Sequence, residues 1–166
     1  MNPSPDVTLV DVDETVADQL LRLAKRDASP DEVAPPLGGP GWNLERTAWF
    51  YSYHHAAAGG LDGPAAEKSW AVFSGGRIAG SVRLKRDTSA GIPSAETGIW
   101  LGRSFRSRGI GGAALHLVLE EARGAGISRV TARTLAGNAG ARRLLTSAGA
   151  QLMLDDDGTV RAVVEL

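Results

Sequence analysis

Two arginines and three glycines gather in one short segment that is well suited to bind an anion. The segment reads RSRGIGG over residues 106–112 and runs directly into an apolar stretch. Glycines leave the backbone open to close approach by a ligand, and arginines donate charge-assisted hydrogen bonds to phosphate oxygens. The residue types therefore predict a loop that holds a phosphate group.

The neighbours of this loop strengthen the prediction. Residues 96–101 have the composition of a strand, and residues 111–126 carry apolar side chains at helical spacing. A loop between a strand and a helix places its ligand at the helix N-terminus, where the first amides have no partner inside the helix and the helix dipole is positive. We expect these amides to bind the phosphate together with Arg106 and Arg108.

Two other phosphate-binding motifs fit the segment less well. Gly109-x-Gly111-x-x-Ala114 also satisfies the dinucleotide fingerprint, but that fingerprint needs an acidic residue about 20 positions later, where the next strand offers Arg133. Only about fifty residues follow the loop, which is too few for several further strand–helix units. A Walker loop requires Gly-Lys-Ser/Thr, which the sequence lacks.

The loop resembles the signature (Gln/Arg)-x-x-Gly-x-(Gly/Ala) of the GNAT superfamily, the acetyl-CoA-dependent N-acyltransferases, through Arg106-x-x-Gly109-x-Gly111. A second block, Asn138-x-x-Ala141-x-x-Leu144 followed by Gly149, is similar to the family's Asn-x-x-Ala-x-x-Leu-Tyr-x-x-x-Gly-Phe. Residues 95–115 further resemble the branch that acetylates the N-termini of ribosomal proteins. The resemblance is strongest over residues 95–150, and it implies one N-acetyltransferase domain over residues 1–166.

This resemblance implies a binding site for acetyl-CoA as cosubstrate. The cofactor would lie where the mixed central sheet splays between strands 96–101 and 129–135, with the pantetheine arm bound to the backbone of the first strand. The pyrophosphate would lie on the glycine loop. Asn138 would face the cofactor arm, or it would simply cap its helix. Arg142 would approach the adenosine phosphates, or it would remain solvated. The expected cofactor-binding residues are Ile99, Trp100, Leu101, Arg106, Ser107, Arg108, Gly109, Ile110, Gly111, Gly112, Asn138 and Arg142.

Direct acetyl transfer requires an uncharged amine, and an aliphatic amine with a pKa of about 10 is protonated at neutral pH. Glu96 matches a position where related enzymes carry a general-base glutamate, and the alternative is an ordinary carboxylate at a strand edge. The general acid is not identified, because Leu145 occupies the position of the family's tyrosine. The side chains that remain as candidates to line the acceptor site are Tyr51, Tyr53, His54 and His55.

Two classes of function stay open. One is an N-acetyltransferase that acts on a primary amine, either of a small molecule such as an antibiotic or polyamine or of a protein N-terminus. The other is a non-catalytic acyl-CoA-binding or regulatory protein, which the leucine at position 145 favours. Homodimers are common among related enzymes, so a homodimer is an alternative to a monomer.

Composition excludes several other classes. The 166 residues contain no cysteine, which removes disulfides, thiolate metal sites and cysteine nucleophiles. No HExxH, Glu-x-x-His pair or carboxylate cluster supports a metal site. Without an apolar run of about 18 residues or a signal peptide, we expect a cytoplasmic protein that does not enter a membrane. A nucleic-acid partner is not expected, because the arginines cluster around one loop.

The elements that position these residues follow from hydrophobic periodicity and from Gly and Pro. They predict an α/β fold in the order β-α-α-β-β-β-α-β-α-β-β, the order of a GNAT fold, with an irregular loop over residues 28–41 and a flexible N-terminus over residues 1–6. The expected elements are strand 7–12, helix 13–28, helix 44–58, a hairpin of 69–74 and 77–86, strand 96–101, helix 111–126, strand 128–135, helix 138–149, and a hairpin of 150–154 and 159–166.

Overall fold

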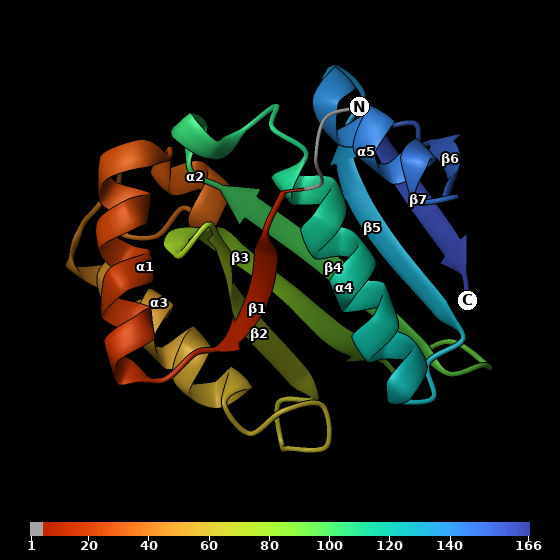
Figure 1. The fold of residues 1–166 in the computed structure, drawn as a ribbon, viewed down its shortest axis with the longest axis horizontal. Helices are drawn as coiled ribbons and strands as arrows, with labels where there is room; N and C mark the ends of the chain where they lie inside the picture. Colours follow the sequence, from red (N-terminus) through yellow and green to blue (C-terminus); the bar gives the residue numbers. More distant parts are fainter. Residues whose placement is uncertain (1–4) are drawn as a thin grey trace.

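A single mixed sheet of seven strands forms the centre of the computed structural model, which describes residues 5–166 (Figure 1). The strand order is β1-β2-β3-β4-β5-β7-β6, and β4 and β5 are parallel while the other neighbours are antiparallel. The predicted α/β class is confirmed. The strands are β1 (Val7–Asp11), β2 (Glu67–Ser74), β3 (Arg77–Asp87), β4 (Ser94–Leu101), β5 (Arg129–Leu135), β6 (Gln151–Leu154) and β7 (Thr159–Glu165).

The helices follow the predicted order with one addition. The prediction of an irregular loop over residues 28–41 is wrong at α2, which is a single helical turn. A capping box explains this turn, because Ser29 and Glu32 satisfy each other's backbone amides and Pro30 is tolerated at the first helical position. The helices are α1 (Glu14–Asp27), α2 (Pro30–Val33), α3 (Leu44–Ala57), α4 (Ile110–Gly124) and α5 (Ala139–Ser147), with a 3-10 turn, η1 (Arg103–Phe105), after β4.

The expectation of a flexible N-terminus over residues 1–6 falls largely outside the described residues, which begin at residue 5. Asp6 is described, and its carbonyl oxygen accepts a hydrogen bond from the Gly75 N–H at 2.9 Å. The chain is therefore joined to the β2–β3 turn one residue before β1 begins.

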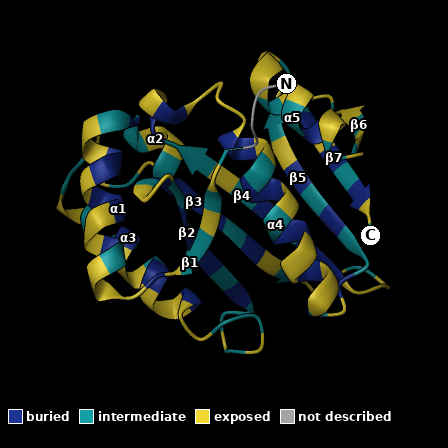
Figure 2. Cartoon of the chain, viewed as in Figure 1, coloured by how far each residue is buried: buried dark blue, intermediate teal, exposed yellow. Residues whose placement is uncertain are grey.

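Two hydrophobic clusters hold the helices to the sheet. Trp70 of β2 packs in one cluster with Val118 of α4, whereas the next residue, Ala71, packs in the other with Leu20 of α1 and Phe50 of α3. Successive side chains of a strand point to opposite faces, so α4 covers one face and the α1–α3 pair covers the other. Figure 2 shows the buried residues along the middle of the sheet and on the sides of the helices that meet it.

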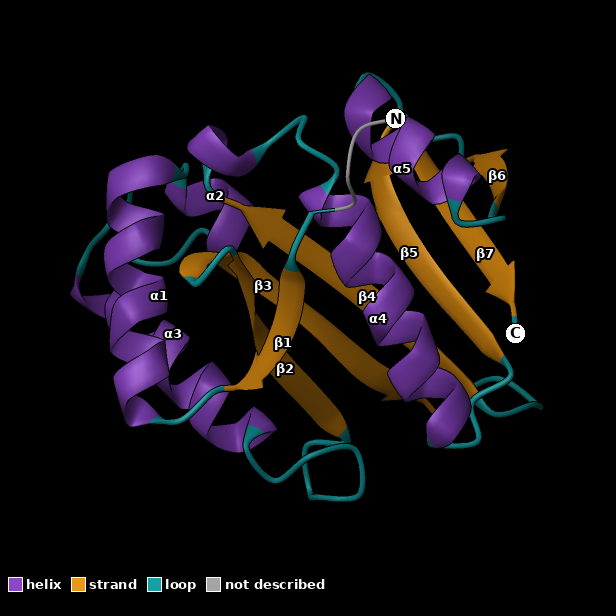
Figure 3. Ribbon diagram, in the orientation of Figure 1, coloured by secondary structure: helices purple, strands orange, loops and turns teal. Residues whose placement is uncertain are grey.

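The sheet opens between β4 and β5. These strands pair at only three positions, from Ser94 with Arg129 to Glu96 with Thr131. Beyond Glu96, β4 continues to Leu101 without a partner on this side, and Figure 3 shows the two strands diverging from their shared end. The predicted splay of the central sheet is confirmed, and it leaves backbone groups of β4 unpaired.

Candidate active site

The free edge of β4 presents alternate peptide groups to the gap. The Gly102 N–H donates to the Ala79 carbonyl oxygen at 2.9 Å, which directs the peptide groups of Gly102 toward β3. Because peptide groups alternate along a strand, those of Ile99 and Leu101 face the gap and those of Trp100 face β3. The gap therefore offers the backbone groups of Ile99 and the Leu101 N–H to an extended ligand, while the Leu101 carbonyl oxygen accepts from Arg106. The contact of Ile99 and Leu101 with pantetheine stays a prediction.

The glycine loop ends in three free amides. Gly109 has φ +79° and caps α4, and the first hydrogen bond of the helix runs from the Ala113 N–H to the Gly109 carbonyl oxygen at 3.2 Å. The N–H groups of Ile110, Gly111 and Gly112 consequently donate to no backbone carbonyl within the described chain. A Cβ at Gly112 would meet no atom of residues 5–166 within 4 Å, so the described chain leaves this corner of the cradle open.

The two arginines of the loop have different surroundings. Arg106 donates from Nε and Nη2 to the Leu101 carbonyl oxygen at 3.1 and 2.9 Å, and from Nη2 to Glu32 Oε2 at 2.6 Å. Arg108 is exposed and makes no hydrogen bond or ion pair within residues 5–166. Between them, Ser107 has φ +60°, a left-handed conformation. Within the described residues, Arg108 therefore offers its whole guanidinium to an anion, whereas Arg106 has only Nη1 without a contact.

The predicted residues at α5 lie at its N-terminus. Asn138 caps the helix, since its side chain accepts a hydrogen bond from the Ala141 N–H at 3.1 Å. The Arg142 guanidinium donates from Nη1 to the Ala136 carbonyl oxygen at 3.0 Å in the preceding turn. The capping alternative for Asn138 is confirmed, and the contacts of Asn138 and Arg142 with the cofactor stay predictions.

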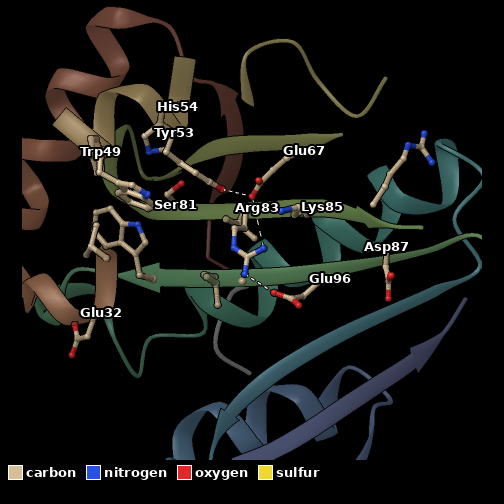
Figure 4. A pocket seen from close by; sticks show the side chains of 17 residues that line it. Glu32, Trp49, Tyr53, His54, Glu67, Ser81, Arg83, Lys85, Asp87 and Glu96 are labelled. Atoms are coloured by element: carbon tan, nitrogen blue, oxygen red, sulfur yellow. Dashed lines mark hydrogen bonds and ion pairs between the residues drawn. The ribbon is translucent and has the colours of Figure 1, made fainter. Parts of the chain in front are cut away.

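A cavity of about 770 Å³ opens on the α1–α3 face of the sheet, between α2, α3 and strands β2 to β4 (Figure 4). Glu96 lines it, as do Ile99 and Trp100, which are also predicted cofactor residues. Figure 4 shows Glu32 at one end of the cavity and Asp87 at the other. This acceptor cavity, as we call it below, therefore reaches the same stretch of β4 that borders the gap.

A chain of polar contacts crosses the acceptor cavity. The Tyr53 hydroxyl donates to Glu67 Oε2 at 2.7 Å, and Arg83 Nη1 lies 3.8 Å from the same oxygen. Arg83 Nη2 then donates to Glu96 Oε1 at 2.6 Å, and this contact is among those dashed in Figure 4. The Glu67 side chain is 11% exposed and that of Glu96 is 45% exposed. Two carboxylates thus share one guanidinium, which leaves the group with a net negative charge.

The structure separates the four candidate side chains of α3. Tyr53 and His54 line the acceptor cavity, where Tyr53 also stacks on Trp49 with ring centroids 5.1 Å apart. Tyr51 and His55 line a different cavity of about 670 Å³, which His54 also borders, and the Tyr51 hydroxyl donates to Asp18 Oδ1 at 2.6 Å there. Helical spacing explains why Tyr51 and His55 lie together, because residues four positions apart share a face of a helix.

Burial changes the acid–base behaviour of both side chains in the acceptor cavity. Burial, followed by the hydrogen bond to Glu67, raises the pKa of the Tyr53 hydroxyl far above its ordinary value. Burial lowers the pKa of His54 to about 4, and His54 Nδ1 lies 2.8 Å from Ser69 Oγ. Tyr53 therefore keeps its proton and His54 stays neutral near pH 7, which makes neither a ready donor of a proton.

Leu145 points into the protein interior. It is 6% exposed and belongs to the cluster that contains Val118 of α4. No hydroxyl replaces the family's tyrosine at this position.

Within residues 5–166, no group of three or more His, Asp or Glu side chains is placed to hold a metal ion, and no helix is long and apolar enough to cross a membrane.

Sequence reasoning did not identify Glu67 and Arg83, the two charged side chains that connect Tyr53 to Glu96 in the acceptor cavity. A weak signal for Glu67 exists, because it lies four positions before the buried Ala71 and therefore on the same face of β2. A charged residue at an inward position of a buried strand is unusual and indicates a partner or a function. Arg83 carries the same signal on β3, where its neighbours Val82 and Leu84 are buried on the other face.

Comparison with known proteins places these features in a family context. The family model described as "Acetyltransferase (GNAT) family" matches residues 40–150. This range includes the glycine loop, the free edge of β4 and most of the acceptor cavity. No curated protein sequence matches the chain.

Solved structures share the fold at low sequence identity. RimJ of Mycobacterium smegmatis, in complex with CoA-disulfide, matches with a TM-score of 0.77 and 20% identity over 96% of this chain and 81% of that chain. RimL, a ribosomal L7/L12 alpha-N-protein acetyltransferase in complex with coenzyme A, matches with a TM-score of 0.73 and 18% identity over 96% and 94%. The microcin C7 self-immunity acetyltransferase MccE, in complex with acetyl-CoA and AMP, matches with a TM-score of 0.72 and 18% identity over 96% and 92%.

Proposed function

Because the chain belongs to the GNAT acetyltransferase family, we propose that it transfers the acetyl group of acetyl-CoA to a primary amine of a small molecule or a protein N-terminus. One observation carries the proposal. The stretch of β4 around Ile99 and Trp100 borders both the gap next to the free amides of α4 and the acceptor cavity with its carboxylates. An acyl donor and an amine would meet at this stretch.

The residues at the gap fit a coenzyme A diphosphate. The amides of Ile110, Gly111 and Gly112 have no partner, the position of a Gly112 Cβ is open, and Arg108 is unpaired in the described chain. The peptide groups of Ile99 and the Leu101 N–H are available for the pantetheine arm, whereas the Leu101 carbonyl oxygen accepts from Arg106. When bound there, acetyl-CoA supplies the activated acyl group; the protein holds it and leaves its reactive end to the acceptor cavity.

The acceptor cavity suits a protonated amine. Its central group of Glu67, Arg83 and Glu96 carries a net negative charge. The stacked rings of Trp49 and Tyr53 provide an aromatic wall, and a cation is attracted to the face of an aromatic ring. An ammonium must lose a proton before it attacks, and a carboxylate of this group accepts it. Glu96 is the base that the family resemblance implies, and the more buried Glu67 is a second candidate.

A non-catalytic acyl-CoA-binding protein is the second candidate function. The observation that favours it is Leu145, whose side chain lies in the core at the position of the family's tyrosine. Release of CoA thiol from acetyl-CoA across a panel of primary amines separates the two functions. Turnover with any amine supports the enzyme, whereas CoA binding without turnover supports the sensor. Because the sequence has no cysteine, a thiol reagent reports only the coenzyme.

Substitution of Gly112 tests the diphosphate site. We expect Gly112→Asp to raise the Kd for CoA at least about tenfold, because a carboxylate in the first turn of α4 repels the diphosphate at close range. The same carboxylate is compatible with the positive end of the helix dipole, so the fold should persist. Titration calorimetry with CoA measures the effect.

The uncharged variant Gly112→Asn is the matched control, since it has nearly the same size. It should raise the Kd less than about threefold. Equal losses of affinity in both variants would indicate a steric effect, and no loss in either would place the diphosphate elsewhere.

A further inference from the structure

We propose that Arg106 is a positioning residue that fastens α2, a wall of the acceptor cavity, to the end of β4, and that it does not bind the cofactor phosphate. We call this arrangement the Arg106 latch; it consists of Arg106, Glu32 and the Leu101 carbonyl oxygen. The inference deepens the proposed function and rests on it. It assigns Arg108 to the coenzyme A site and Arg106 to the acceptor cavity.

The contacts of Arg106 point away from a diphosphate. Both Nε and Nη2 donate to the Leu101 carbonyl oxygen, and Nη2 also donates to Glu32 Oε2 at 2.6 Å. The planar guanidinium is therefore committed along one edge to a carbonyl and a carboxylate. Of the guanidinium nitrogens, only Nη1 makes no contact within residues 5–166, and a phosphate bound there would approach the carboxylate of Glu32, which is a repulsive contact. Arg108, two residues later, makes no such contact with the described part of the chain.

Glu32 connects the latch to the acceptor cavity. Its side chain lines the cavity, and Val33, next to it on α2, lines it as well. Glu32 Oε2 also accepts a hydrogen bond from the Ser29 N–H at 3.3 Å and so completes the capping box of α2. The same oxygen thus shapes the helical turn and receives Arg106.

A second ion pair holds the other side of α2. Arg46 of α3 donates from Nη2 to Asp31 Oδ1 at 2.7 Å, and the Arg46 side chain is only 2% exposed. Four residues are too few to form a stable helix alone, so α2 depends on tertiary contacts. The Asp31 pair joins it to α3, and the Arg106 latch joins it to β4. Loss of the latch should therefore loosen the wall of the acceptor cavity next to β4.

Hydrogen exchange and CoA titration test the latch independently of each other. The variant Arg106→Gln removes the guanidinium, and Glu32→Gln removes the charge that Arg106 meets while a Gln at this position still supports a capping box. We expect each variant to speed exchange of the Glu32 and Ala34 amides about tenfold, because these amides close the turn of α2. We also expect each to leave the Kd for CoA within about twofold.

The matched control is Arg108→Gln, the same change two residues away. It should leave exchange in α2 unchanged and raise the Kd for CoA about tenfold, because it removes the loop arginine that has no partner among residues 5–166. In the thiol-release assay with the fastest amine of the panel, Arg106→Gln and Glu32→Gln should raise the KM for the amine and leave the KM for acetyl-CoA unchanged. A general loss of folded protein would instead lower the apparent kcat and leave both KM values unchanged.

Two results would overturn the latch. One is unchanged exchange in α2 in either Arg106→Gln or Glu32→Gln. The other is a loss of CoA affinity in Arg106→Gln as large as that in Arg108→Gln, which would return Arg106 to the phosphate. Failure of wild-type protein to bind CoA would instead refute the proposed function, and the exchange of α2 would still report whether the contact holds the helix.

Discussion

The guanidinium of Arg83 organises the acceptor cavity at the level of single residues. It lies between Glu67 and Glu96, and Gly98 on the neighbouring strand gives it room, because a Cβ at that glycine would lie only 3.0 Å from Arg83 Nε. Partly buried charges are stable only when paired in good geometry. The glycine, the arginine and the two carboxylates therefore form one unit, and a change in one should alter the positions of the others.

His54 should make the stability of the protein depend on pH. Its folded pKa is about 4 because of burial, whereas an unfolded histidine has a pKa of about 6.5. As the pH falls from 7 to 5, the unfolded chain binds a proton that the folded chain refuses, so the free energy of unfolding decreases, by up to about 2 kcal/mol from this group. Urea denaturation at the two pH values measures the loss.

The variant His54→Gln isolates this contribution. Its free energy of unfolding should fall less between pH 7 and pH 5 than that of wild-type protein, by the same amount of up to about 2 kcal/mol. The exposed neighbour His55 provides the control, and His55→Gln should follow the wild-type dependence. Parallel curves for wild-type protein and His54→Gln would show that His54 titrates normally in the folded state.

Asn138 carries a prediction at the level of an element, because it caps α5. Asn138→Ala should lower the free energy of unfolding by about 1 kcal/mol, while Asn138→Asp should keep the cap and nearly all of the stability. If the Asn138 amide also faces the cofactor arm, both variants should bind CoA more weakly. Urea denaturation and calorimetric titration of the two variants separate the roles, and equal stabilities would argue against the cap.

Elements with a long periodic pattern could be predicted from the sequence, and α2 could not. The capping box of Ser29 and Glu32 is visible in the sequence, but it lies among prolines and glycines and opens a helix of only four residues. Its stability comes from Arg46 and Arg106, which lie 15 and 74 residues further along the chain. Local sequence signals contain no information on such contacts.

The same distinction between local and long-range signals explains which parts of the candidate site could be predicted. The glycine loop was predictable because its residues are consecutive and lie at a junction of strand and helix. The acceptor cavity was not, since Tyr53, Glu67, Arg83 and Glu96 come from four different elements. Only antiparallel pairing of β2, β3 and β4 brings Glu67, Arg83 and Glu96 together. Family resemblance pointed to Glu96, whose role as the base stays a prediction, and gave no signal for its ion-pair partner Arg83.

At the scale of the whole molecule, the split sheet joins two parts through a short seam. Strands β1 to β4 and strands β5 to β7 share only three paired positions, and α4 with its hydrophobic cluster covers the junction. A cofactor bound in the gap would add contacts to β4 and to the start of α4. Binding to the folded state alone stabilises it in proportion to the logarithm of ligand concentration.

CoA should therefore raise the melting temperature. At a hundred times its Kd, it adds about 2.7 kcal/mol, which corresponds to about 5–10 °C for a chain of this size. Thermal unfolding followed by circular dichroism measures the shift. Gly112→Asp at the same CoA concentration should show a smaller shift, and a wild-type melting temperature that does not respond to CoA would contradict binding in the gap.

The tryptophan side chains of the acceptor cavity have a practical consequence for identifying the amine. Two of the four tryptophans, Trp49 and Trp100, line this cavity, and their indole rings would be desolvated or stacked upon when an acceptor enters. The intrinsic tryptophan fluorescence of the unmodified protein should consequently change in emission wavelength or intensity when the acceptor binds. Candidate amines can thus be screened optically, without a label and before any turnover is observed.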